Sequence, residues 1–251
     1  MLKTVDLALK VLMQFNNEKK KWTVNELANH FNENITKIYR ICVTLENNNF
    51  LIRDEETKEY RLGLAISYLS SDLDYAKILK ELVHPYLISL SEKTNESTFF
   101  TLKKGDQGFI LDSCESNNAI RFAVKVGSSA PLYAGATYRA ILAFMDEEEI
   151  NQILSKKLEK FTQYSKVTKE EILESLMEIK ENKFALSQGE LTPDVVAIAV
   201  PIIQDGVVLA SLTVAGPSYR INKIKIREIT DDLFKIQKEL QDNINFGRFL
   251  L

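Results

Sequence analysis

The chain has few of the residues that build disulfide frameworks and metal centres. Its 251 residues include only 2 cysteines, 2 histidines and 1 tryptophan. The cysteines, Cys42 and Cys114, lie far apart, and no CxxC pair is present. A disulfide framework and the common zinc motifs, which need several ligands at short spacing, are therefore excluded. This cysteine usage fits a reducing compartment.

Motifs of nucleophilic and metal-dependent enzymes are missing as well. No GxSxG, HExxH or GxxxxGK[ST] occurs, and neither His30 nor His84 lies near a nucleophile motif. Cys114 has no histidine nearby in sequence, so we expect a buried or half-buried thiol. We predict no catalytic residue, no metal and no cofactor. An enzyme with a site built from carboxylates alone stays open as an alternative.

Long apolar runs are absent. No segment approaches the roughly 18 uninterrupted apolar residues that a membrane helix needs. The first ten residues, MLKTVDLALK, carry Lys3, Asp6 and Lys10, which interrupt any signal-peptide core. We therefore expect a cytoplasmic protein without a membrane partner.

The bulk composition is that of a globular protein. Hydrophobic residues make up 45% and charged residues 27%, and the length predicts one large or two modest domains. Residues 1–64 hold 10 Lys and Arg against 9 Asp and Glu, and the remainder holds 22 against 26, so charges of +1 and −4 make up the net −3. If the first segment binds nucleic acid, its positive charge must be concentrated on one face. A neutral domain without a polyanion partner remains the alternative.

The first 64 residues carry signals for three helices and a β-hairpin. We expect helices over residues 4–15 and 24–30, the second opened by Thr23 and Glu26, whose side chains can cap backbone N–H groups. After a turn at residues 32–34, the stretch NITKIYRICVTLENNNFL indicates a third helix whose inner face holds Ile38, Ile41, Cys42 and Leu45. FLIRDEETKEYRLG then indicates two strands around a turn at residues 55–58. This order is typical of a winged helix-turn-helix domain, and a small helical interface domain is the alternative.

The rest of the chain predicts an α+β domain. Residues 64–93 have a helical pattern with a break near 70–72, and strand-like runs follow in TFFTLKKGDQGFILDSCE and AIRFAVKVG. Helical character returns in GATYRAILAFM, over residues 146–158, and in TKEEILESLMEIKENKF, which opens with a second capping box. The dipeptide Asp205-Gly206 predicts a hairpin, and a terminal helix is expected over residues 223–241. We expect an antiparallel sheet with helices on one side.

The order of these motifs resembles the isocitrate lyase regulator (IclR) family of bacterial transcription regulators. The likeness covers nearly the whole chain, through TVDLALKVL, TVNELANHF, ITKIYRICVTLENNNFL, YRLG, KVGSSAPLYAGATYRAILAF, NKFALSQGE, AIAVPI and LASLTVAGP. The resemblance implies a winged helix-turn-helix domain joined by a helix to a GAF/PAS-like effector-binding domain. It also implies regulation by a small-molecule effector, an organic acid or an aromatic compound.

Three departures from the family pattern stand out. The third helix opens with Glu33, Thr36 and Lys37 instead of a Leu-x-x-Ser-Thr pattern. Asn49 replaces the glycine before the aromatic residue of the wing, and asparagine tolerates the left-handed conformation. Tyr138-Arg139 replaces a Gly-Lys pair. An acidic residue at position 33 is not expected beside a DNA-binding surface.

The expected partner of the first domain is a double-stranded DNA operator. Thr36, Lys37 and Arg40 lie at the end of the third helix that enters the major groove in such domains, so they are candidates for base or phosphate contact. The lysines at 19–21 are more often part of a solvated loop. The full set of candidate DNA-binding residues is Thr23, Thr36, Lys37, Tyr39, Arg40, Thr44, Arg53, Lys58 and Arg61.

The expected effector site lies around the start of the helix in PLYAGATYRAIL. Exposed N–H groups at a helix start suit a carboxylate, although a tight packing turn is an equally good interpretation. Arg139 is either a clamp for a carboxylate or a solvent-facing residue. The resemblance implies a pocket lined by Phe122, Leu132, Ala136, Thr137, Ser187, Glu190, Ala197, Thr213 and Ala215.

These expectations combine into one domain plan. Residues 1–64 form the DNA-binding domain, 65–77 a linker helix and 78–246 the effector-binding domain. We expect a homodimer, with a dimer of dimers as a further step, because operator half-sites need two DNA-binding domains. The dimer contact would use apolar residues of the first helix and of residues 64–75, namely Leu7, Val11, Leu64, Ile66 and Leu69. A repressor is expected rather than an activator, and a constitutive DNA-binding protein with a vestigial sensor domain is the alternative.

Overall fold

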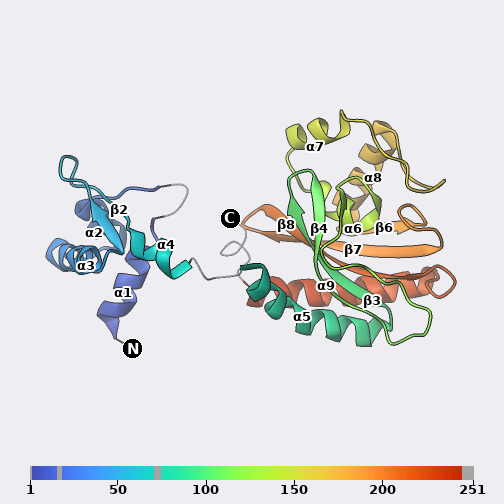
Figure 1. The fold of residues 1–251 in the computed structure, drawn as a ribbon, viewed down its shortest axis with the longest axis horizontal. Helices are drawn as coiled ribbons and strands as arrows, with labels where there is room; N and C mark the ends of the chain where they lie inside the picture. Colours follow the sequence, from blue (N-terminus) through green and yellow to red (C-terminus); the bar gives the residue numbers. More distant parts are fainter. Residues whose placement is uncertain (1, 16–18, 71–74, 245–251) are drawn as a thin grey trace. The chain divides into compact units, whose positions relative to one another are not determined.

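The computed structural model describes residues 2–15, 19–70 and 75–244. The chain divides into two compact units, Met1–Asp74 and Tyr75–Leu251 (Figure 1). Parts of the sequence-based expectations fall outside the described residues: positions 16–18 of the first loop, positions 71–74 of the expected linker helix with its break, and the last two residues of the expected effector domain.

The first unit contains three helices, a two-stranded antiparallel hairpin and a short fourth helix. In chain order they are α1 (Lys3–Leu12), α2 (Val24–Phe31), α3 (Ile35–Asn47), β1 (Leu51–Arg53), β2 (Tyr60–Leu62) and α4 (Leu64–Ser70). α1 ends three residues earlier than expected. The N–H groups of Gln14 and Phe15 donate to the carbonyls of Val11 and Leu12, three residues back, which forms tighter turns than an α-helix. The carbonyl of Gln14, which a further α-helical turn would use as an acceptor, accepts instead from the indole of Trp22.

Local capping explains where α2 and α3 begin and end. The Thr23 hydroxyl accepts from the N–H of Glu26 while the Glu26 carboxylate accepts from the N–H of Thr23, so the predicted capping box is confirmed. Asn32 ends α2 in the left-handed region, with φ of 50°. Asn49 also adopts a left-handed conformation, with φ of 60°, which confirms that asparagine can serve in the turn ahead of the hairpin.

The inner face of α3 is core, as its periodicity predicts. Ile38, Ile41 and Cys42 are buried against Leu27 of α2 and Val11 of α1. Burial raises the pKa of the Cys42 thiol to about 11, so this thiol stays protonated at neutral pH. Of the residues proposed for a dimer contact, Leu7 and Val11 belong to this same core, so the prediction that they face a second copy is wrong.

The second unit is an α+β domain built on a six-stranded antiparallel sheet with strand order β5-β4-β3-β8-β7-β6. Its elements are α5 (Tyr75–Thr94), β3 (Ser97–Lys104), β4 (Gln107–Cys114), β5 (Ser129–Pro131), α6 (Gly135–Leu142), α7 (Glu147–Leu154), α8 (Lys169–Asn182), β6 (Ala185–Gln188), β7 (Val195–Gln204), β8 (Val207–Pro217) and α9 (Lys223–Asn243). Asp205 and Gly206 have φ of 52° and 81° in the predicted hairpin between β7 and β8.

Helices cover both faces of this sheet, so the expectation of helices on one side is wrong. α5 and α9 pack on one face, and α6 with α8 packs on the other (Figure 1). The need for two helix layers can be seen in β8, where every residue from Val208 to Gly216 is buried. A strand buried on both faces needs a layer on each side of the sheet.

Two segments differ from their predicted structure. The alternating stretch AIRFAVKVG is not a strand; Phe122 and Val124 turn toward the core, but the segment forms no ladder with a neighbouring strand. The helix expected over 146–158 ends at Leu154. In AIRFAVKVG, apolar and polar residues do alternate. Such alternation shows which side chains face the core, but it does not show that the backbone is hydrogen-bonded to a neighbouring strand.

Candidate functional sites

The outer face of α3 presents a row of exposed side chains on the first unit. Asn34 caps the helix by accepting from the N–H of Thr36 at 2.8 Å, which holds the first turn in place. Thr36, Tyr39, Arg40 and Thr44 are exposed along the helix, on the side opposite Ile38. The hydroxyl of Thr44 donates to the carbonyl of Arg40 at 2.8 Å, so its oxygen remains available as an acceptor.

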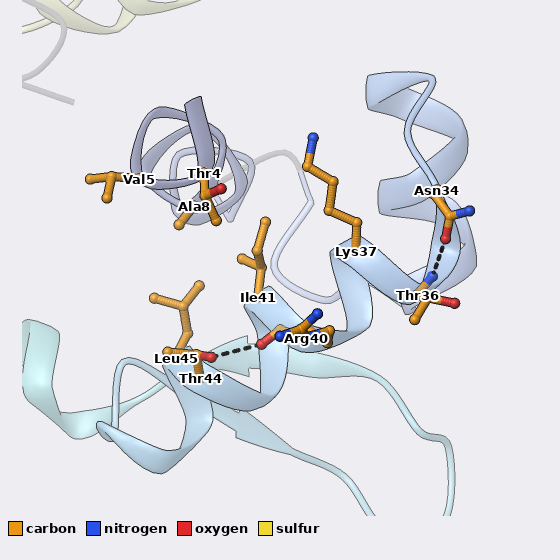
Figure 2. Close-up of a pocket in the computed structure, with 10 residues that line it drawn as sticks. All are labelled: Thr4, Val5, Ala8, Asn34, Thr36, Lys37, Arg40, Ile41, Thr44 and Leu45. Atoms are coloured by element: carbon orange, nitrogen blue, oxygen red, sulfur yellow. Dashed lines mark hydrogen bonds between the residues drawn. The ribbon is translucent and has the colours of Figure 1, made fainter. Parts of the chain in front are cut away.

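A groove of about 590 Å³ runs between α1 and α3 (Figure 2). Its α1 side is formed by Thr4, Val5 and Ala8. Its α3 side joins apolar and polar groups, and Figure 2 shows Ile41 and Leu45 facing α1. The remaining lining residues are Asn34, Thr36, Lys37, Arg40 and Thr44. Four of the predicted DNA-binding residues therefore share one surface.

Glu33 has a direct partner among these residues. Its carboxylate accepts from the ammonium of Lys37 at 2.9 Å, one helical turn away. Glu33, an acidic residue not expected beside a DNA-binding surface, therefore partly neutralises the charge of Lys37, which is a predicted DNA contact. Within residues 2–15 and 19–70, Arg40 makes no ion pair, so its charge is the more available of the two.

Other cations of the first unit are also held by carboxylates. Lys19 pairs with Glu26 at 2.7 Å, Lys21 with Glu59 at 3.5 Å, and Lys58 with Glu55 at 3.4 Å. These are exposed pairs of small individual stability, so an approaching phosphate can compete for the cation. Residues 2–15 and 19–70 therefore form no basic arm, in line with the composition.

Thr23 is a predicted DNA-binding residue whose hydroxyl is already engaged within the protein. Its hydroxyl is shared between the N–H of Glu26 at 3.3 Å and the carboxylate of Glu26 at 3.0 Å. Hydrogen bonds from Lys19 and Thr23 lower the pKa of Glu26 to about 2, so a full negative charge sits beside this hydroxyl. That charge disfavours a phosphate contact by the Thr23 side chain.

The hairpin carries the remaining candidates. Arg53 is half-buried with its guanidinium 5.9 Å from the centre of the Tyr60 ring, and Arg61 is exposed on the neighbouring strand. Lys58 is exposed at the tip of the turn with φ of 60°. Only Arg61 and Lys58 are therefore placed on the outer surface of the hairpin.

The second unit contains a small cavity of about 50 Å³ between α6, the sheet and the segment before β7. Of the nine predicted lining residues, six border it: Phe122, Ala136, Thr137, Ser187, Glu190 and Ala197. Eight further residues complete the lining and were not predicted: Phe99, Val124, Ala134, Gly135, Tyr138, Leu191, Thr192 and Val195. Two of these had a signal in the sequence, since Val124 and Val195 stand two positions from Phe122 and Ala197 on alternating segments.

Leu132, Thr213 and Ala215 do not line this cavity. Leu132 is fully buried in the core beneath α6. Thr213 and Ala215 stand on β8 and pair with Phe99 and Ala197, so they lie on the same face of the sheet as these two cavity residues and are buried beside them. The Thr213 hydroxyl is buried and has no hydrogen-bond partner among the described residues.

Arg139 is neither a clamp open to ligand nor a solvent-facing residue. Its side chain is fully buried and donates to both carboxylate oxygens of Glu190, at 2.5 and 2.7 Å, and to the carbonyl of Tyr133 at 3.3 Å. Glu190 in turn borders the cavity while Arg139 stands behind it. The bidentate pair is therefore an internal structural contact.

The start of α6 is also occupied from within the chain. The Ser187 hydroxyl accepts from the N–H of Ala136 at 3.0 Å. Gly135 has φ of 70°, which a glycine adopts without strain and which brings the helix start against Ser187 and Leu191. Tyr138 packs its buried ring over Gly108 of β4, and burial raises its pKa to about 12.

Two negative findings apply to the described parts of the chain. Across residues 2–15, 19–70 and 75–244, no helix is both long and apolar enough to cross a membrane. The same residues hold no group of three or more His, Cys, Asp or Glu side chains arranged to bind a metal ion. His84 contacts the buried carboxylate of Asp112 at 2.6 Å, and neither residue lines the cavity.

Comparison with known proteins assigns the chain to a family. The model of the C-terminal domain of IclR bacterial transcriptional regulators matches residues 73–241. The HTH-type transcriptional regulator BhcR of Paracoccus denitrificans is 26% identical over 220 residues, covering 87% of this chain and 79% of that protein. KipR of Bacillus subtilis, also an HTH-type transcriptional regulator, is 26% identical over 234 residues, covering 91% and 92%.

A solved structure agrees with this assignment. The IclR transcriptional regulator from Alicyclobacillus acidocaldarius is 26% identical and superposes with a TM-score of 0.62, covering 96% of this chain and 98% of that one. The chain belongs to the IclR family of bacterial transcriptional regulators.

Proposed function

We propose that the protein is a DNA-binding transcriptional repressor whose first unit is a winged helix-turn-helix domain and whose second unit binds a small-molecule effector. In this proposal α3 is the recognition helix, and the β1–β2 hairpin is the wing. The protein acts in the cytoplasm and is not an enzyme. The observation that carries the proposal is the exposed row on α3, with Arg40 free of ion pairs inside the described part of its unit.

The chemistry of α3 supports sequence-specific binding. An arginine can donate two hydrogen bonds to a guanine in the major groove, and threonine can contact phosphate or a thymine methyl group. Arg40 lies between Thr36 and Thr44, one helical turn from each, so one helix can make contacts of both kinds. Arg61 and Lys58 on the hairpin supply phosphate contacts flanking the groove.

The protein acts as a homodimer in this proposal, with a dimer of dimers as a further step. α1 exposes Val5 and Leu9, its flanking residues Leu2 and Met13 are exposed as well, and α4 exposes Leu64, Tyr68 and Leu69. Burying such apolar surface against a second copy is favourable and would present two recognition helices to two half-sites. Effector binding in the second unit then shifts the population between arrangements that differ in operator affinity.

Operator binding can be tested with duplexes that the protein itself selects. Sequences are selected from a library of genomic fragments, and the dissociation constant of the selected duplex is measured by fluorescence anisotropy at one salt concentration. Arg40→Ala should weaken binding by about 1–3 kcal/mol and relax the preference at one or two base pairs. Arg227→Ala, which removes an exposed arginine from α9, is the matched control and should bind as the wild type does. Equal affinity and equal preference in Arg40→Ala would refute the role of α3.

Glu33 provides a second test in the opposite direction. Glu33→Gln removes a negative charge and releases Lys37 from its 2.9 Å ion pair. We expect tighter binding and a salt dependence steeper by about one phosphate contact, because Lys37 can then displace a counterion from the DNA. Weaker binding by Glu33→Gln would mean that this ion pair holds Lys37 in its binding position.

A further inference from the structure

The lining of the cavity in the second unit offers no cation to a ligand. The lining residues include no lysine, arginine or histidine, and Glu190 is the one carboxylate among them. The positive charge nearest to Glu190 belongs to Arg139, which does not line the cavity. Both carboxylate oxygens of Glu190 already accept from that guanidinium. An anionic ligand would therefore meet a carboxylate and no free countercharge.

One donor at the helix start beside the cavity is already used inside the protein. The N–H of Ala136, which could bind a carboxylate, donates to the Ser187 hydroxyl. The polar groups that remain for a ligand are uncharged: the hydroxyl groups of Thr137, Ser187 and Thr192, and backbone N–H groups of the first turn of α6. The rest of the wall is apolar, so an ionised ligand would lose its hydration without gaining a charged partner.

The cavity volume limits the size of the ligand. A cavity of about 50 Å³ is small beside the roughly 300–1,000 Å³ of pockets that bind drug-sized ligands. A ligand of a few non-hydrogen atoms fits, with a short apolar part against Phe99, Phe122 and Val124.

We propose that the effector is a small uncharged molecule with a carbonyl, amide or hydroxyl group, and that Glu190 is the residue that excludes carboxylates. The Glu190 carboxylate is bound by Arg139, so it uses the guanidinium that a ligand carboxylate would otherwise need as its partner. This proposal rests on the proposed function, since it names the chemical class of the effector for the same site.

Matched pairs of a carboxylate and its amide test the proposal on the full chain. Propionate is compared with propionamide, and pyruvate with pyruvamide, by calorimetric unfolding at equal ionic strength and at concentrations up to tens of millimolar. The amides should raise the unfolding temperature of the second unit in a saturable way, whereas the carboxylates should not, because only a ligand that binds the native state stabilises it.

Variants of the cavity should change this preference. Glu190→Gln leaves the Arg139 charge uncompensated, so propionate and pyruvate should bind at least tenfold more tightly than they bind the wild type. Glu181→Gln, which removes an exposed carboxylate from α8, is the matched control and should keep the preference for amides. Ser187→Ala frees the N–H of Ala136 without changing the ion pair and should raise carboxylate affinity if Glu190→Gln does not fold.

Three outcomes would overturn the proposal: tighter binding of the carboxylates by the wild type, equal binding of both members of a pair, or stabilisation by neither. A wild-type protein that prefers amides but binds no selected DNA would refute the proposed function instead, so the two failures can be told apart.

Discussion

Replacing Arg139 by methionine should strongly destabilise the second unit. The variant keeps most of the apolar stem but leaves the Glu190 carboxylate, which is only 8% exposed, without its two hydrogen bonds from the guanidinium. Breaking a buried pair by removing one partner costs about 3–5 kcal/mol, because the remaining charge is uncompensated. For a unit of this size each kcal/mol lowers the unfolding temperature by about 2–4 °C, so a decrease of roughly 6–20 °C is expected.

The single tryptophan separates the two units in this experiment. Trp22 lies in the first unit and Arg139 in the second, so the emission of Trp22 follows only the unfolding of the first unit. Arg139→Met should lower the transition of the second unit, measured by calorimetry and far-ultraviolet circular dichroism, while the fluorescence transition stays in place. Equal shifts in both signals would show that the units unfold together.

The double variant Arg139→Met/Glu190→Leu is the decisive control. Replacing both members of a buried ion pair by apolar residues of similar volume is often neutral or stabilising, so the double variant should regain most of the lost stability. A single variant within about 1 kcal/mol of the wild type would refute the reasoning. So would a double variant as unstable as the single one, since the loss would then come from packing and not from the stranded charge.

Two further predictions concern the first unit and use the same Trp22 signal. The pKa of Glu26 is lowered from 4.5 to about 2, so its contribution to stability is complete above pH 4.5 and is lost as the pH falls through about 2. Urea unfolding between pH 2 and 5 should show this loss in the wild type, and the slope should be smaller in Glu26→Gln. Asn49 has φ of 60°, so Asn49→Ala should cost about 1 kcal/mol whereas Asn49→Gly should cost less. Equal costs for alanine and glycine would show that the side chain of Asn49, and not its backbone conformation, stabilises the turn.

Much of the fold follows from local signals in the sequence. The capping boxes at Thr23 and Thr168 mark helix starts because the side chain that ends the loop also satisfies the first N–H groups of the helix. The hairpin at Asp205-Gly206 follows from the positive φ that those residues tolerate. Each such signal lies within a few residues, so it can be recognised without reference to distant contacts.

Contacts between distant segments are what the sequence does not show. Arg139 meets Glu190, and Ser187 meets Ala136, across about 50 positions, and only the packing of α6 against the end of β6 brings these groups together. The resemblance to IclR regulators therefore implied Glu190 and Ser187 as cavity residues but not their partners. The pairing of Glu33 with Lys37 lies one turn apart on the chain and could have been anticipated from spacing alone.

The sheet of the second unit also bears on how the protein can change over evolution. Along β7 and β8 the even-numbered residues from 196 to 202 and from 210 to 214 pack under α5 and α9, while Ala197, Thr213 and Ala215 face α6. A substitution at one of these odd positions reshapes the neighbourhood of the cavity and leaves the opposite layer untouched. If the proposed effector site is correct, residues that shape its surroundings alternate along the same two strands with residues that hold the sheet to α5 and α9.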